Sequence, residues 1–190
     1  ESEPVVKLLQ ENAYLEMLYQ AKCNADARSL LLAYAEKSDL DHLALTEYGL
    51  TRLVVTPADN TAIPPVEAVY ESDERLRERC ILSFDGMNTA GSANAYRYFT
   101  LSADGRVDGI KVKSDEATPC FLDIVITQVD SENGAASEEL IQIIQTALDP
   151  DTVRPVGDRP TVKSSIATNY QIEAVLYVGK NAKDALLLEA

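Results

Sequence analysis

This 190-residue sequence has only three cysteines, one histidine and no tryptophan. Residues that form disulfides or bind metal ions are therefore scarce. Cys23, Cys80 and Cys120 are odd in number, far apart and outside any CxxC pair. This usage argues against a disulfide scaffold and favours a reducing compartment, so we expect three buried thiols that act as small apolar side chains. We also expect neither a signal peptide nor a membrane-spanning helix, since the sequence shows no apolar run near the ~20 residues that such a helix needs.

Basic residues are in the minority as well. The chain has 17 Lys and Arg against 31 Asp and Glu, for a formal net charge of −14. A phosphate backbone or an anionic membrane surface would be repelled, because affinity for both rests on basic side chains. We therefore predict that neither nucleic acid nor a membrane is a partner. Apolar residues make up 46% and charged residues 25%, which are ordinary values for a chain with a folded core.

Sequence motifs of catalysis are absent. There is no Walker loop, no GxGxxG and no GxSxG. The only histidine, His42, lies close to Asp39 and Asp41, which leaves open a metal-dependent enzyme that uses these three side chains. The simpler interpretation is that the aspartates cap a helix and that His42 lies in its first turn, since so few ligands cannot close a metal site. We predict no catalytic, cofactor-binding or metal-binding residue, and hence a protein that is not an enzyme.

The amino-terminal part is predicted to be helical. No Gly or Pro lies between Pro4 and Gly49, and apolar residues recur at helical spacing, which predicts a helix over 5–36 with a break possible near Asn24. A short helix over 40–48 follows, capped by Ser38 or Asp39 and ended by Gly49. Residues 50–70 then form a proline-rich crossing arm, in which 53–55 is a short extended stretch.

Two more helices are expected before residue 104. Ser72 begins the first, whose apolar face we assign to Leu76, Cys80, Ile81 and Phe84. Its three arginines alternate with acidic residues, which favours ion pairs within the helix; the residues are Arg75, Arg77 and Arg79 with Asp73, Glu74 and Glu78. Thr89 is the expected cap of the second helix, over 90–102.

The pattern changes after Gly105. A strand near 107–112 is followed by 121–129, which is apolar on both faces and predicts a central strand covered on both sides. Ser137 begins a helix that Pro150 ends, and strands over Thr161–Thr168 and Tyr170–Val178 follow. We predict an α+β fold, with a helical domain over 1–104 and, over 105–180, a β-β-α-β-β sandwich of one helix on a mixed or antiparallel four-stranded sheet. Residues 181–190 are expected to begin a further, truncated segment.

Several stretches, in order, carry a family resemblance. They are Leu31-Leu32-Ala33-Tyr34-Ala35, Asp39-Leu40-Asp41-His42-Leu43-Ala44, Tyr48-Gly49-Leu50-Thr51-Arg52-Leu53, Glu71-Ser72-Asp73-Glu74, Ser83-Phe84-Asp85-Gly86, Thr89-Ala90-Gly91, Ala95-Tyr96-Arg97-Tyr98 and Asp151-Thr152-Val153-Arg154-Pro155-Val156. Over about residues 5 to 180 the chain resembles the baseplate assembly protein J family of contractile-tailed bacteriophages. Ser92 departs from the family pattern, in which a proline is common after Thr-Ala-Gly.

The resemblance implies a structural protein of the tail baseplate, assembled in the bacterial host cytoplasm. Its expected partners are other baseplate proteins, namely wedge and hub components and a tail protein I-like protein, in a homo- or hetero-oligomer. Such proteins make wedge contacts around the hub and couple to contraction of the sheath. We expect the amino-terminal helix and the arm over 53–70 to make most of the contacts. A protein-binding adaptor unrelated to phage is a further alternative.

Overall fold

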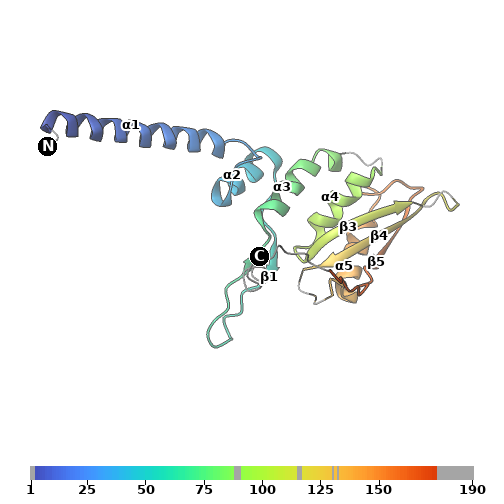
Figure 1. Ribbon diagram of the computed structural model, residues 1–190. Helices are drawn as coiled ribbons and strands as arrows, with labels where there is room; N and C mark the ends of the chain where they lie inside the picture. Colours follow the sequence, from blue (N-terminus) through green and yellow to red (C-terminus); the bar gives the residue numbers. More distant parts are fainter. Residues whose placement is uncertain (1–2, 88–90, 115–116, 130, 132, 175–190) are drawn as a thin grey trace.

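The computed structural model describes residues 3–87, 91–114, 117–129, 131 and 133–174. The α+β class is confirmed (Figure 1). In chain order the elements are α1 (Pro4–Ser29), α2 (Lys37–Tyr48), β1 (Val54–Thr56), β2 (Val69–Tyr70), α3 (Asp73–Leu82), the 3₁₀ helix η1 (Asp85–Met87), α4 (Ala93–Ala103), β3 (Val107–Ser114), β4 (Phe121–Gln128), α5 (Glu138–Leu148) and β5 (Arg159–Ser164). No helix in this described part is long and apolar enough to cross a membrane.

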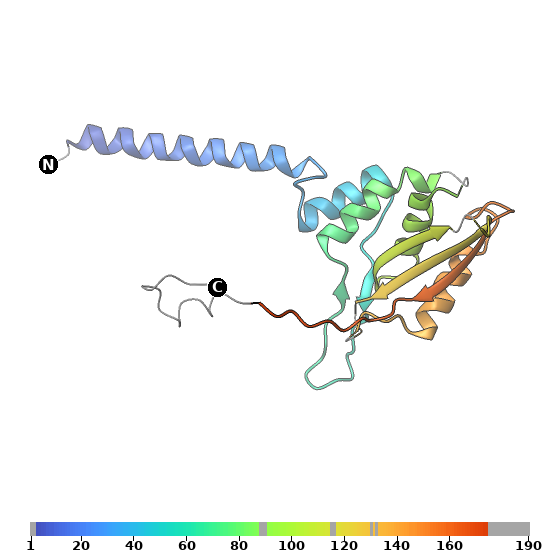
Figure 2. The same cartoon turned by 45° about the vertical axis from the view of Figure 1, so that its right-hand side comes forward.

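The first helix is shorter than the sequence predicts. α1 is continuous through Asn24 and ends at Ser29, and turns over residues 30–34 replace the predicted continuation to residue 36. None of its 26 residues is buried. Figures 1 and 2 both show α1 extending away from the rest of the molecule. Its helical structure therefore rests on local propensity and not on packing against the described residues.

Serine caps begin three of the other helices. The side chains of Ser72, Ser92 and Ser137 each accept a hydrogen bond from the backbone N–H three residues later, which satisfies a donor that the helix itself leaves free. Ser92 thus takes the capping role predicted for Thr89, which lies outside the described residues. Helix α2 begins directly after Glu36 and not at a Ser38 or Asp39 cap.

A small core joins α2 to α3. Its buried members are Ala35, Leu40, Ala44, Leu50, Leu76 and Cys80. Only part of the predicted apolar face of α3 is therefore correct, because Ile81 is exposed and Phe84 lies beyond the end of the helix with its side chain also exposed. The expectation of three buried thiols is wrong for Cys23 and Cys120, which are exposed.

A second core lies between the sheet and the helices α4 and α5. The sheet has the order β3-β4-β5, with β3 antiparallel and β5 parallel to β4. Ile124 and Ile126 of β4 are fully buried against α4 and α5. The central place of this strand is confirmed, but the prediction of cover on both faces is wrong for the described residues, since Phe121 on the other face is half exposed.

The predicted fourth strand is not formed where the structure describes it. Residues 165–174 leave β5 as an extended segment without strand pairing, and residues 175–178 of the prediction lie outside the described residues. Two helices, α4 and α5, cover the sheet in place of the single helix predicted. The first correction concerns a strand that does not form over the described residues, and the second concerns which helices cover the sheet.

Candidate interaction surfaces

A buried carboxylate connects the arm to the body of the protein. Glu71 follows β2, and its side chain is fully buried. Its Oε1 accepts hydrogen bonds from Arg79 and, at 3.0 Å, from the backbone N–H of Leu53, while Oε2 lies 3.4 Å from Nε of Arg75. Two guanidinium groups therefore balance one carboxylate at the base of the arm.

Arg75 links this network to the start of the sheet. Its guanidinium donates to the carbonyls at the end of α4 and in the following loop, namely Leu101 at 3.1 Å, Asp104 at 2.7 Å and Gly105 at 2.5 Å, and also to Val107. Burial lowers the pKa of Arg75, and the charge of Glu71 opposes that effect. The side chain thus closes the carbonyl-rich turn between α4 and β3.

The prediction that the arginines of α3 pair with Asp73, Glu74 and Glu78 within the helix is wrong. Arg75 and Arg79 pair with Glu71, before the helix, and Glu78 pairs with Arg97 of α4 at 2.6 Å. Arg77 donates to the carbonyls of Leu32 and Ala35, at 2.8 and 2.7 Å. The missed signal is the spacing of Glu71, Arg75 and Arg79 by four residues each, which places all three on one side of a helical path.

Arg52 holds the other side of the arm. Its Nε donates to Asp41 and its Nη2 to Asp73, each at 2.7 Å, and its Nη1 donates to the carbonyl of Glu71. The backbone N–H of Lys37 and the Arg52 guanidinium hold the pKa of the Asp73 carboxyl below its usual range. Helices α2 and α3 and the arm are therefore fixed to one another by charged hydrogen bonds.

This arrangement also places the candidate metal ligands. Asp41 is engaged by Arg52, and Asp39 and His42 are exposed on α2. In the described part of the chain, no group of three or more His, Cys, Asp or Glu side chains is arranged to hold a metal ion. The structure does not bring Asp39, Asp41 and His42 together as a site.

Within the arm, residues 54–70 form an antiparallel hairpin that projects from the body (Figures 1 and 2). At its tip, Asp59 accepts hydrogen bonds from the backbone N–H and hydroxyl of Thr61 and exchanges backbone hydrogen bonds with Val66, and Ile63 precedes a cis proline. The hydrogen bonds from Thr61 hold the pKa of Asp59 low. The tip is thus shaped by its own local bonds while Ile63 is 99% exposed.

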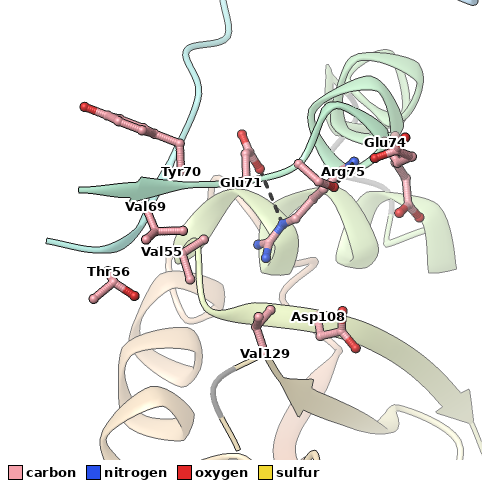
Figure 3. Close-up of a pocket in the computed structure, with 11 residues that line it drawn as sticks. Val55, Thr56, Val69, Tyr70, Glu71, Glu74, Arg75, Asp108 and Val129 are labelled. Atoms are coloured by element: carbon pink, nitrogen blue, oxygen red, sulfur yellow. Dashed lines mark hydrogen bonds and ion pairs between the residues drawn. The ribbon is translucent and has the colours of Figure 1, made fainter. Parts of the chain in front are cut away.

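A pocket of about 640 Å³ lies where the arm meets the sheet (Figure 3). Val55 and Val69 of the arm line one side, and Val129 at the end of β4 lines another, with Arg75 and Asp108 adding polar groups. The arm packs closely against the turn before β3, since a Cβ at Gly105 would clash with the carbonyl oxygen of Val54. The acidic side chains of Glu71, Glu74 and Glu78 also line the pocket, which is therefore apolar toward the arm and charged toward α3.

Helix α1 also exposes apolar side chains to solvent. Eight large apolar side chains in its first four turns are each between 48% and 69% exposed, namely Val5, Leu8, Leu9, Tyr14, Leu15, Met17, Leu18 and Tyr19. Exposed apolar surface of this extent marks interaction sites. The arrangement suits contact with another protein.

Comparisons with known proteins find similarity over most of the chain. The model of the baseplate J-like N-terminal domain matches residues 1–59, and that of the baseplate J-like central domain matches residues 88–164. The chain is 46% identical over 178 residues to baseplate protein J of Escherichia phage P2. This match covers 94% of the chain and 58% of that relative.

Proposed function

Because the chain belongs to the baseplate J-like family, we propose that it is a structural component of the tail baseplate of a contractile-tailed bacteriophage or prophage. The observation that carries the proposal is α1, a 26-residue helix none of whose residues is buried. A partner that covers such a helix would bury its exposed apolar side chains, and this burial favours association. An assembly subunit needs an exposed contact surface of this kind, whereas a monomeric enzyme does not.

In the finer proposal, the protein makes wedge contacts around the hub of the baseplate and couples them to the sheath. Its partners are wedge and hub components and a tail protein I-like protein. The rigid base of the arm supports this role, because the buried bonds of Glu71 and Arg75 let a force on the arm reach α4 and the sheet. Assembly takes place in the bacterial cytoplasm, and the final location is the virion tail.

Immunogold electron microscopy tests the proposal. Antibody raised against this chain is applied to an induced lysate of the bacterium that carries the gene. Gold at the distal end of contractile tails is the expected result. Gold confined to the soluble fraction, with tails present but unlabelled, would overturn the proposal and restore the adaptor interpretation.

The arm is tested by deletion of residues 56–68 in the full-length protein. We expect the variant to fold with an unchanged melting temperature, because the bonds of Glu71 and Arg52 lie outside the deletion, but to fail to enter particles. A matched control, Ile63→Ser, removes one exposed apolar side chain and leaves the arm in place. Normal particles from the deletion variant would exclude the arm as a contact surface.

A further inference from the structure

The face of the sheet that α4 and α5 leave open carries three apolar side chains, Phe121, Val125 and Val129, which we call the stripe; Asp123 and Thr127 alternate with them along β4. Side chains alternate along β4, so Ile124 and Ile126 point into the core while Phe121 and Val125 point to the other side. Val129, one residue beyond the strand, continues this series and is 50% exposed. It also lines the pocket beside the arm (Figure 3), so the stripe runs from Phe121 into that pocket.

Basic side chains flank the stripe on both sides. The register places Lys111 of β3 and Lys163 of β5 opposite Val125, and Arg159 opposite Phe121 with its guanidinium 5.8 Å from the centre of the ring. Lys113 lies opposite Asp123, which pairs with Lys163 at 2.7 Å. Four of the 17 basic residues of an otherwise acidic chain, net charge −14, thus gather on one sheet face.

The spacing of these groups matches the width of a helix. Neighbouring strands lie about 4.8 Å apart, so the basic rows of β3 and β5 are about 10 Å from each other. A helix is about 10–12 Å across with its side chains. Laid along β4, a helix would bury an apolar stripe on Phe121 and Val125 and hold its flanking residues above the lysines.

We propose that the open face of the β3-β4-β5 sheet docks an acidic amphipathic helix of a neighbouring baseplate protein. The inference rests on the proposed function. Charge complementarity selects this occupant. Acidic side chains along both edges of the helix would lie next to the basic residues of β3 and β5 and would offset the repulsion between those basic residues. Helix α1 of a second copy fits less well, since it has three basic and three acidic residues. Nucleic acid fits less well, because it offers no apolar side chains for the stripe and is repelled by the rest of the chain.

Photo-crosslinking in assembled tails tests the inference. The photoreactive residue p-benzoylphenylalanine replaces Phe121 in the full-length protein, and the crosslinked peptides are identified by mass spectrometry. We expect one main adduct, on a helical peptide of another tail protein with acidic residues three or four positions apart. The matched control places the same residue at Phe84, which is exposed but off this face, and is expected not to label that peptide. Adducts only to this protein, to DNA or to no macromolecule would overturn the inference.

Charge reversal supplies a second readout. Lys111→Glu with Lys113→Glu should lower the yield of complete tails at least tenfold, while Lys111→Arg with Lys113→Arg should assemble normally. Both doubles should melt at the wild-type temperature, because these side chains are exposed. Wild-type yield from the glutamate double would overturn the inference. If wild-type tails carry gold label but Phe121 gives no adduct, only the docking helix is wrong; if the tails carry no label, the proposed function fails as well.

Discussion

At the scale of single residues, Glu71 is a buried carboxylate in contact with two guanidinium groups. Its fully buried side chain balances Arg75 and Arg79, and each of these also donates to backbone carbonyls. Removing one member of a buried ion group leaves uncompensated charge, which typically costs about 3–5 kcal/mol. We expect Glu71→Gln to lower the free energy of unfolding by about 3 kcal/mol, measured by urea titration at pH 7.

An exposed ion pair gives the matched control. Lys22 and Asp26 lie 3.3 Å apart on α1, with side chains 73% and 65% exposed. Asp26→Asn should change the free energy of unfolding by less than about 0.5 kcal/mol. Equal effects of the two substitutions would mean that Glu71 is no more than a surface charge.

Asp73 makes the stability depend on pH. Its pKa is lowered in the folded state by the hydrogen bond from the Lys37 N–H and by Arg52. The unfolded chain therefore takes up this proton at a higher pH, so the contribution is present above about pH 4 and is lost as the pH falls through the folded-state pKa. We expect Asp73→Asn to cost about 1–2 kcal/mol at pH 7, and this difference to shrink as the pH falls below about 4.

Urea titrations of both proteins between pH 2.5 and 7 measure that difference. Asp149→Asn is a suitable control, because the carboxylate of Asp149 is exposed at its contact with Arg154. A cost of Asp73→Asn that stays constant down to pH 2.5 would contradict the assignment.

At the residue scale, sequence alone predicted some contacts and missed others. The cap at Ser72 and the left-handed Gly49 follow from local rules and are confirmed. The carbonyl partners of Arg75 were missed, because the carbonyl-rich turn over 101–107 exists only after α4 and β3 pack. The pairing with Glu71 was also missed, although its spacing of four residues from Arg75 is visible in the sequence. The expectation that Asp39, Asp41 and His42 form no metal site stays a prediction.

At the scale of elements, α1 is energetically separate from the body. None of its residues is buried, so it contributes little to the stability of the two cores. A variant that begins at Leu30 should therefore unfold within about 0.5 kcal/mol of the parent chain, as expected for surface changes. Urea titration followed by tyrosine fluorescence measures this. A loss above about 1 kcal/mol would show that α1 packs on the body in solution.

The elements that sequence predicted correctly are those that local patterns determine. Apolar periodicity located α3, α5 and β4, although it assigned Ile81 and Phe84 wrongly to the apolar face of α3. It failed for the end of α1, because the turn over 30–34 is fixed by Arg77, which reaches the carbonyls of Leu32 and Ala35 from a distant helix. It also failed for residues 170–174, whose alternation gives the period of a strand but not the edge with which that strand would pair.

At the scale of the whole molecule, charge is distributed less evenly than the sequence suggests. The net charge is −14, yet Arg52, Arg75 and Arg79 are drawn into the interior of the arm base and other basic groups gather on the open sheet face. Acidic side chains therefore dominate the remaining surface and repel one another. The division of the chain into two domains near residue 104 stays a prediction. Arg75 of α3 hydrogen-bonds to Val107 of β3 across this boundary.

This self-repulsion predicts how stability responds to salt. Exposed ion pairs weaken with salt but contribute little, and the buried pairs of Glu71 are screened much less. Relief of the repulsion between surface carboxylates should therefore prevail, so we expect the free energy of unfolding at pH 7 to rise by about 1 kcal/mol between 20 and 300 mM NaCl. Urea titrations at both salt concentrations measure this. The same comparison at about pH 4.4, where the composition of the sequence gives a net charge close to zero, should show almost no rise. A fall in stability at pH 7 would instead mean that attractive pairs, and not repulsion, dominate the surface.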